Sequence, residues 1–253
     1  MSDLLKKAGT GSAQTTYQVS VVVPIYNEAV VLPRFFSHHA KLLQQGVWQW
    51  IFVDGGSTDQ SRELMQHATS SFANVCMLES QKGRSAQQSL GLAKAIAPYV
   101  VFLHVDTLLP ANVEAIFARE LRGVNNNDQK CWGRFNVKFE EDCAPMMHVV
   151  AWFMNQRSRL TGIATGDQAI FVNKLLLQAV GGLPNQALME DVELSKRLKR
   201  HVPPVCLAEK VETSSRRWQK NGVWRTILLM WRLRYRYFVG DSPQKLTALY
   251  NRD

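Results

Sequence analysis

The stretch Val19-Ser20-Val21-Val22-Val23-Pro24-Ile25-Tyr26-Asn27-Glu28 decides the fold class of this chain. It begins with a mostly apolar, β-branched run, which is typical of a strand buried inside a sheet. Tyr26, Asn27 and Glu28 then follow without a break. Because ligands of open α/β sheets bind beyond the carboxyl ends of the strands, this order predicts a binding loop directly after the first strand.

Strands and helices alternate along the first half of the chain. Strand patterns occur at residues 50–53, 75–79 and 100–105, and helical patterns at residues 31–45, 59–69, 85–97 and 110–122. This alternation predicts an α/β fold with a mostly parallel central sheet flanked by helices. The second half is less regular, with strands expected at 133–140 and 166–172 and helices at 145–157, 190–200 and 224–238.

The composition is that of an ordinary globular protein. The chain has 253 residues, of which 46% are hydrophobic and 20% charged, so it can bury a core without disulfides. We expect a flexible leader at residues 1–16, one α/β domain at 17–218 and a basic, aromatic helical extension at 219–253. Residues 1–16 are polar and no long apolar run occurs, so we expect a cytoplasmic protein with reduced cysteines.

The net charge of +9 is concentrated late in the chain. Residues 1–195 carry 16 Lys/Arg and 17 Asp/Glu, whereas residues 196–236 carry 12 Lys/Arg and 2 Asp/Glu. A local basic zone of this kind indicates an anionic partner such as a phosphate, an acidic membrane or nucleic acid. A solvated basic face is the alternative interpretation.

Asp106 is the first candidate for chemistry. It follows the buried pattern Phe102-Leu103-His104-Val105, and a carboxylate at a strand end is costly unless it is paired or binds a metal. Mg²⁺ often uses one or two carboxylates together with substrate phosphates. Asp106 is therefore a candidate metal ligand, and the alternative is a turn or helix cap before Pro110.

Glu190 and Asp191 are the second candidate. One of these adjacent acids would act as a general base beside a hydroxyl, and the alternative is that both only complement the dipole of the helix they begin. Two further segments suit a nucleotide. Asp54-Gly55-Gly56-Ser57-Thr58-Asp59 allows close backbone approach, unless it is simply a turn, and Lys82 and Arg84 precede a helix where a diphosphate could bind.

Taken together, these segments resemble the family 2 glycosyltransferases of the GT-A fold. The stretch 19–28 is similar to that family's opening strand and nucleotide loop, and the turn at 54–59 to its D-[DG]-G-S-x-D turn. His104-Val105-Asp106 stands at the place of the D-x-D metal motif and Glu190-Asp191 at that of the E-D pair. Arg216-Arg217-Trp218 resembles the end of Q-x-x-R-W, and order and spacing match over residues 19–218.

The resemblance implies an inverting, metal-dependent transfer of a sugar from a nucleoside diphosphate, with a UDP-sugar favoured, to an acceptor hydroxyl that the sequence does not identify. It implies Asp191 as the general base with Glu190 beside it, and Mg²⁺ or Mn²⁺ on Asp106. The residues expected to bind the donor are Pro24, Tyr26, Asn27, Glu28, Asp54, Gly55, Ser57, Lys82, Arg84, His104, Arg217 and Trp218. Trp218 either stacks near the acceptor or is a core aromatic residue.

Two departures from the family pattern matter. His104 replaces the first Asp of D-x-D, which puts in doubt how the ribose or the metal-bound phosphates are held. Ser214 stands where the family has Gln, which argues against a processive polysaccharide synthase. The segments L-H-V-D-T, G-D-Q-A-I-F, M-E-D-V-E-L and S-S-R-R-W together resemble a subgroup commonly labelled arsenosugar-biosynthesis glycosyltransferase.

The helix expected at 224–238 leaves two interpretations open. Trp224, Leu228, Trp231, Tyr235 and Phe238 share one face, and Arg225, Arg232 and Arg236 lie to one side of it. We favour packing of the aromatic face against the domain, closing over the acceptor site. The other interpretation is peripheral contact with an anionic membrane, on its inner face.

Other functions are less well supported by the motifs. P-loop, dinucleotide-binding and nucleophile-elbow motifs are absent, and Tyr26-Asn27-Glu28 stands where a nucleotidyltransferase would have a Gly-rich basic loop. We expect no nucleic-acid partner. The alternative from another class is a non-catalytic nucleotide-sugar or nucleic-acid binding protein that uses the basic C-terminal segment.

Overall fold

The central feature of the computed structural model is one sheet of eight strands, in the order β3-β2-β1-β4-β7-β6-β8-β5. Residues 17–120 and 131–250 are described, so the predicted leader at 1–16 lies outside the described residues. The strands are β1 Val19–Ile25, β2 Trp48–Asp54, β3 Val75–Glu79, β4 Tyr99–Phe102, β5 Thr107–Leu108, β6 Trp132–Phe139, β7 Ile170–Asn173 and β8 Val205–Thr213.

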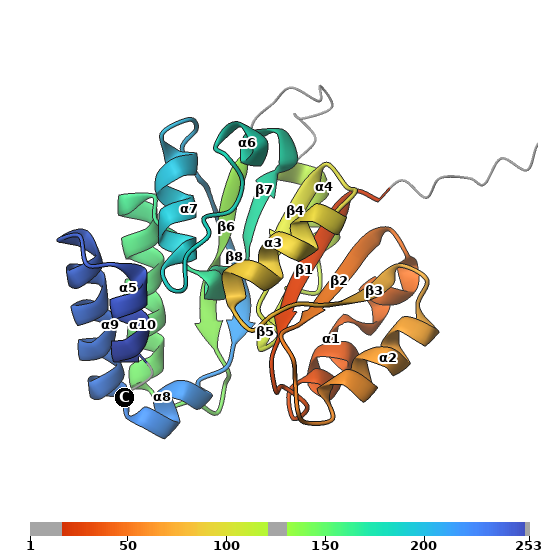
Figure 1. Cartoon of the computed structure of the whole chain (residues 1–253), viewed down its shortest axis with the longest axis horizontal. Coiled ribbons are helices and arrows are strands. Elements are labelled where there is room, and N and C mark those ends of the chain that lie inside the picture. Colours follow the sequence, from red (N-terminus) through yellow and green to blue (C-terminus); the bar gives the residue numbers. More distant parts are fainter. Residues whose placement is uncertain (1–16, 121–130, 251–253) are drawn as a thin grey trace, which may run out of the picture.

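The helices cover both faces of this sheet (Figure 1). They are α1 Leu32–Gln45, α2 Ser61–Ser71, α3 Arg84–Lys94, α4 Val113–Glu120, α5 Met146–Thr161, α6 Lys174–Ala179, α7 Glu190–Lys199, α8 Arg216–Asn221, α9 Val223–Phe238 and α10 Pro243–Tyr250, with a 3₁₀ turn, η2, at Gly166–Gln168. In Figure 1, α5, α9 and α10 gather at the end of the molecule opposite α1 and α2.

The predicted α/β fold class is confirmed, and the sheet is mixed, with more parallel than antiparallel strand pairs. Strands β3, β2, β1 and β4 pair in parallel, as the alternation predicts. β7 is antiparallel to both β4 and β6, and β5 is antiparallel to β8, while β6 and β8 are parallel. The antiparallel pairs arise because the second half lacks the regular strand–helix alternation that forces parallel crossovers.

The site opens where β1 and β4 part. On β1, β4 pairs only with Val19 to Val22, and the last hydrogen bond between them runs from the Leu103 N–H to the Val22 carbonyl (3.0 Å). Pro24 follows that point, where β1 is paired with β2 alone, so its missing N–H costs no bond to β4. The two strands therefore diverge at this point, and the loops that follow them carry Asn27 and Asp106.

The C-terminal helix α9 packs through the face opposite to the expected one. Thr226, Leu229 and Leu233 are buried, and the two leucines cluster with residues at the start of α7. The predicted aromatic face, from Trp224 to Phe238, is exposed. The prediction that this face packs on the domain is therefore wrong, because the leucines of the other face fill the contact. In the described part of the chain, no helix is long and apolar enough to cross a membrane.

Candidate functional site

The loops after β1 and β2 are bonded into one unit. Asn27 has a left-handed backbone (φ 54°), its N–H donates to Ser57 Oγ (2.9 Å), and its side-chain oxygen accepts the Thr58 N–H (2.8 Å). The Ala29 N–H donates to Asp59 Oδ2 (3.0 Å). Asn tolerates the left-handed region better than most residues. The predicted nucleotide loop is therefore held in place by the predicted nucleotide turn.

Asp54 ends β2 and is only 1% exposed. Its carboxylate accepts the Ser57 N–H (3.1 Å) and hydroxyl (2.5 Å), and Arg62 lies 3.7 Å away. The side chain of Gln87 packs closely against Gly55, and its Nε2 would lie 3.0 Å from a Cβ added at that position. The turn is thus tightly packed, and the contact of Asp54 with a nucleobase stays a prediction.

Two basic residues lie at the start of α3, as predicted. Lys82 stands over the ring of Tyr26, with Nζ 4.0 Å from the ring centre, which joins the predicted diphosphate segment to the loop after β1. Arg84 is 3.6 Å from Glu190. Burial alone would lower the pKa of Arg84, but the neighbouring carboxylates, Glu190 first among them, raise it.

Asp106 lies in the turn that follows β4. It is 30% exposed and 3.8 Å from Arg216, which also donates to Glu28 (3.1 Å). Burial is the main cause that raises the pKa of Asp106, and the nearby carboxylate of Asp167 raises it further. A cation bound beside this carboxylate would favour its ionised form.

The residues around Asp106 fit a divalent ion that shares its ligands with a substrate. Within the described residues, no group of three or more His, Cys, Asp or Glu side chains could hold a metal ion. The described residues therefore do not form a metal site from protein ligands alone. One carboxylate is enough where Mg²⁺ takes its other ligands from substrate phosphates and water, so the donor set fits this shared kind of site.

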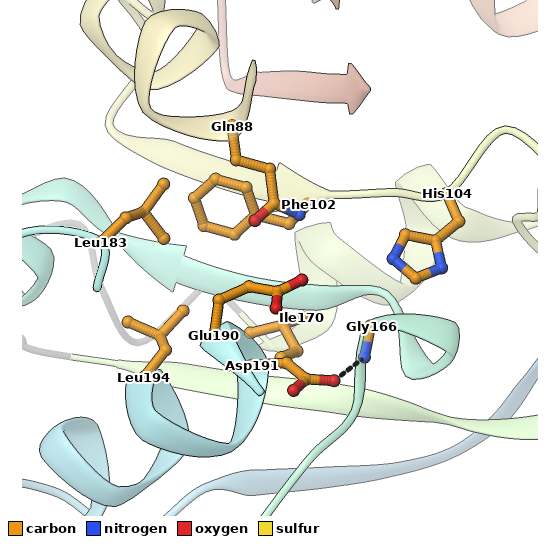
Figure 2. A pocket seen from close by; sticks show the side chains of 9 residues that line it. All are labelled: Gln88, Phe102, His104, Gly166, Ile170, Leu183, Glu190, Asp191 and Leu194. Atoms are coloured by element: carbon orange, nitrogen blue, oxygen red, sulfur yellow. Dashed lines mark hydrogen bonds between the residues drawn. The ribbon is translucent and has the colours of Figure 1, made fainter. Parts of the chain in front are cut away.

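Asp191 and Glu190 begin α7 beside a small pocket (Figure 2). Asp191 Oδ2 accepts the Gly166 N–H (2.9 Å), and Oδ1 accepts the Val192 N–H (2.7 Å). Glu190 is 6% exposed, and burial followed by the charge of Asp191 raises its pKa. Both acids line the pocket together with His104.

His104 connects the strand end after β4 with the segment beside Asp191. Its Nδ1 lies 3.2 Å from Asp167 Oδ1, and its Nε2 is buried with no hydrogen-bond partner. A Cβ on Gly166 would lie 2.4 Å from that Nε2. Glycine is therefore needed at position 166 for His104 to approach the chain that holds Asp191.

Three charged residues of this site were missed by the sequence reasoning. Asp167 lies in η2, and burial alone would raise its pKa, but the hydrogen bond from His104 helps to hold it below the ordinary value. Burial lowers the pKa of Arg157 on α5 and of Arg234 on α9, and the nearby carboxylates of Asp191 and Asp167 oppose that lowering. The segment G-D-Q at 166–168 was a signal for Asp167, but neither arginine belonged to a recognised motif.

The last two predicted site residues, Arg217 and Trp218, lie in the first turn of α8. The Arg217 guanidinium stands over the ring of Tyr250 (3.7 Å), and burial lowers its pKa. Trp218 packs against the main core and meets Phe139 edge to face, with 6.0 Å between ring centres. This packing favours the interpretation of Trp218 as a core aromatic residue over contact with an acceptor.

Comparison with known families places residues 20–122 in the sequence model described as Glycosyl transferase family 2. Among curated proteins, the undecaprenyl-phosphate 4-deoxy-4-formamido-L-arabinose transferase of Pectobacterium carotovorum is 32% identical over 97 residues. That alignment covers 36% of this chain and 30% of the relative. The chain therefore spans about a third of the length of this curated relative.

Two solved structures share the fold. The mannosyltransferase PcManGT from Pyrobaculum calidifontis, in complex with GDP-Man and Mn²⁺, matches with a TM-score of 0.65 at 18% identity, over 93% of this chain and 70% of its own. S. aureus TarS 1-349 in complex with UDP-GlcNAc matches with a TM-score of 0.59 at 16% identity, over 78% of this chain and 58% of its own. At these identities the likeness concerns the fold alone.

Proposed function

Because the chain belongs to the family 2 glycosyltransferases and has their GT-A fold, we propose that it catalyses inverting transfer of a sugar from a nucleoside diphosphate to an acceptor hydroxyl. The observation that carries the proposal is the meeting of Asp191, at the start of α7, and His104, just after β4, at one pocket. His104 follows the strand that leads to Asp106, so the donor side and the base share one opening.

The donor lies along the edge formed by the loops after β1 and β2. The loop from Pro24 to Glu28 and Asp54 hold the base, and Lys82, Arg84 and Arg217 neutralise the diphosphate, as guanidinium and ammonium groups do. A nucleotide sugar of this class is supported by the UDP-GlcNAc and GDP-Man complexes of the two structural neighbours. We favour a UDP-sugar on the family resemblance alone.

Asp106 is the residue that would hold a Mg²⁺ or Mn²⁺ ion beside the diphosphate of the donor. When bound, such an ion neutralises the charge that develops on the leaving diphosphate. The Mn²⁺ of the Pyrobaculum neighbour supports this role. Arg216, between Glu28 and Asp106, provides positive charge at the same place.

Asp191 takes the proton from the acceptor hydroxyl while the hydroxyl oxygen attacks the anomeric carbon. The bond between that carbon and the diphosphate breaks on the opposite side, so the configuration inverts. The two N–H bonds to Asp191, from Gly166 and Val192, hold its carboxylate in one orientation at the pocket. Burial, followed by the charge of Asp191, raises the pKa of Glu190, and we assign the role of the base to Asp191.

A screen of nucleotide sugars tests the proposal. The full chain is heated with UDP-, GDP- and dTDP-sugars in Mn²⁺, and the unfolding temperature and the release of free nucleoside diphosphate are recorded. We expect one nucleotide class to raise the unfolding temperature and to be hydrolysed slowly or transferred. Stabilisation by none of them, with salt-dependent DNA binding instead, would favour the non-catalytic alternative.

A further inference from the structure

Arg157 is a half-buried cation, two of whose nitrogen atoms lack a hydrogen-bond partner. It projects from α5, and its Nε and Nη2 atoms are buried without a hydrogen-bond partner. Burial, followed by the charge of Arg234, lowers the pKa of Arg157 to about 10. Unpaired buried guanidinium N–H groups are costly, because each has lost its water without gaining an acceptor. Such a group indicates that a ligand completes the site.

Arg234 brings a second guanidinium to the same place from α9. It is half-buried next to the fully buried Leu233, so the helix packing fixes its direction. No ion pair within 4.0 Å in the described ranges involves Arg157 or Arg234, while Asp191 already accepts two backbone N–H groups. Two neighbouring cations without an ion-pair partner are the arrangement that binds an anion.

We propose that Arg157 and Arg234 form a binding site for a phosphate group of the acceptor, beside the carboxylate of Asp191. The inference rests on the proposed function, because it names the chemistry of the acceptor that this function needs. Two guanidiniums match the double charge of a phosphate monoester better than the single charge of a carboxylate. The acceptor hydroxyl is then the group of the same molecule that reaches Asp191.

The two arginines belong to the acceptor side rather than to the donor side. The predicted donor cations, Lys82 and Arg84, lie at the start of α3, next to the loops after β1 and β2. Arg157 and Arg234 come from α5 and α9, which gather at the end of the molecule opposite α1 and α2 (Figure 1). Asp191 lies between the two sets, since its charge acts on Arg84, Arg157 and Arg234 alike.

Calorimetric titration with inorganic phosphate tests this site in the full chain without metal or nucleotide. We expect saturable binding that falls by about tenfold or more in Arg157→Gln and in Arg234→Gln. The matched controls are Arg159→Gln and Arg232→Gln, two residues away on the same helices and exposed. Both should bind phosphate as the wild type does. Acetate should bind more weakly than phosphate.

Phosphate affinity that is unchanged in Arg157→Gln and Arg234→Gln would overturn the site. The nucleotide-sugar screen reports separately on the proposed function. If a nucleotide sugar stabilises the chain and the arginine variants keep their phosphate affinity, this inference fails while the proposed function stands. If phosphate binding depends on both arginines and no nucleotide sugar binds, the proposed function fails instead.

A second inference comes from the outer face of α9. Five side chains, which we name the apolar stripe, are between 64% and 83% exposed. They are Trp224, Leu228, Trp231, Tyr235 and Phe238. On α5, Trp152 and Phe153 are 55% and 61% exposed, with ring centres 4.9 Å apart. A row of exposed apolar side chains along one helix face is typical of an interaction surface.

The charges beside the apolar stripe indicate what covers it. Arg225 and Arg232 lie on one flank of the stripe and are exposed, in the segment 196–236 that carries 12 Lys/Arg against 2 Asp/Glu. A two-fold dimer through this face would place the same arginines against their own copies. An anionic surface would instead gain from them. Trp and Tyr are also the residues that favour the boundary between lipid and water.

We infer that the apolar stripe rests on the surface of an anionic lipid bilayer. The helix lies parallel to the surface, with its aromatic rings among the head groups and its arginines beside lipid phosphates. This orientation leaves the buried face of α9, with Leu229 and Leu233, attached to the domain. It therefore brings the pocket of Asp191 near a membrane surface.

Sedimentation with lipid vesicles tests the contact. The full chain should bind vesicles of phosphatidylglycerol and not of phosphatidylcholine, and salt should weaken the binding. The double variant Trp224→Ala/Trp231→Ala should lose at least about tenfold of the partition, and Arg232→Gln should lose less. Ile96→Ala, which removes an exposed apolar side chain elsewhere (64% exposed), is the control and should bind normally.

Two results would overturn the membrane contact. One is equal binding of the wild type and the double tryptophan variant to anionic vesicles. The other is a wild-type dimer in analytical ultracentrifugation that Trp231→Glu converts to a monomer, because the apolar stripe would then be covered by a second copy.

Discussion

The two halves of the sheet place their functional groups by different means. In the first half, the candidate groups lie in loops directly after strands, and backbone hydrogen bonds hold them, as with Asn27 and Ser57. In the second half, long side chains reach the site from helices, as Arg157 does from α5 and Arg234 from α9. A loop site is thus fixed by its local sequence, whereas a helix-borne site depends on how whole helices pack.

This difference suggests a division of labour between the halves. The family match covers residues 20–122, the part of the chain in which hydrogen bonds join the loops after β1 and β2. The acids and arginines of the other half surround Asp191, where the acceptor would react. We therefore expect substitutions in the first half to change donor affinity and those in the second half to change turnover.

Asp191→Asn should have the largest effect and sharpens this division most. Removing a general base lowers the rate by about 10²- to 10⁴-fold, while donor affinity should stay within about twofold. Steady-state kinetics and donor titration with the purified variant measure the two quantities separately. Glu193→Gln, on the same helix turn but paired with Arg197, is the control. Equal turnover in Asp191→Asn and wild type would remove Asp191 as the base.

Asp106→Ala should lower donor affinity, the property that we assign to the first half of the molecule. Without its carboxylate, metal-dependent donor affinity should fall by about tenfold, which corresponds to about 1.4 kcal/mol. Calorimetry with a nucleotide in the presence and absence of Mn²⁺ measures the change. Glu63→Gln, an exposed acid on α2, should bind as the wild type does. Affinity in excess Mn²⁺ that is the same with and without Asp106 would count against its role as metal ligand.

The sequence predicted the loop-built half well and the helix-built half only in part. The strands at Val19–Ile25 and Val75–Glu79 have the expected bounds, because an apolar run between turn residues is a local signal. β8 was missed because Glu209, Lys210 and Glu212 interrupt its pattern. In the structure, Glu209 and Glu212 are paired with arginines of other segments, Arg119 and Arg34.

The same reasoning explains which site residues could be found. Asp54, Asp106 and Asp191 were recognisable because each stands at the end of a strand or the start of a helix. Arg157 and Arg234 were not, because a basic residue on a helix looks like a solvated one until the packing turns it inward. The exposed aromatic face of α9 was misjudged for the related reason that α9 has apolar residues on two faces.

Gly91→Ala tests how tightly the first half is packed. A Cβ on Gly91, in α3, would lie 2.4 Å from Val22 Cγ1 and 3.2 Å from Val53 Cγ2. Overpacking costs about 1–3 kcal/mol, whereas the gain in helix propensity is about 1 kcal/mol, so we expect a net loss of up to about 2 kcal/mol. Urea unfolding measures it. Ser89→Ala, exposed on the same helix, should not lower stability, and a stable Gly91→Ala would show that α3 can shift.

His39 gives the smallest expected effect, which depends on pH and belongs to the first half. The ring is 3% exposed, its Nδ1–H donates to the Phe35 carbonyl (2.9 Å), and its Nε2 accepts the Leu109 N–H (3.2 Å). Burial lowers the pKa of His39 from 6.5 to about 3. The folded protein therefore holds His39 in its neutral form. The contribution of this residue to the free energy of unfolding is complete above about pH 6.5 and is lost as the pH falls towards 3. Each pH unit of that fall should remove about 1.4 kcal/mol from the free energy of unfolding. Urea unfolding near pH 7.5 and near pH 5.5 measures the loss, and His39→Gln, which keeps a donor and an acceptor, should reduce it. An equal loss in both proteins would mean that another group carries the acid sensitivity, and that the link from α1 to the segment behind Asp106 is not its source.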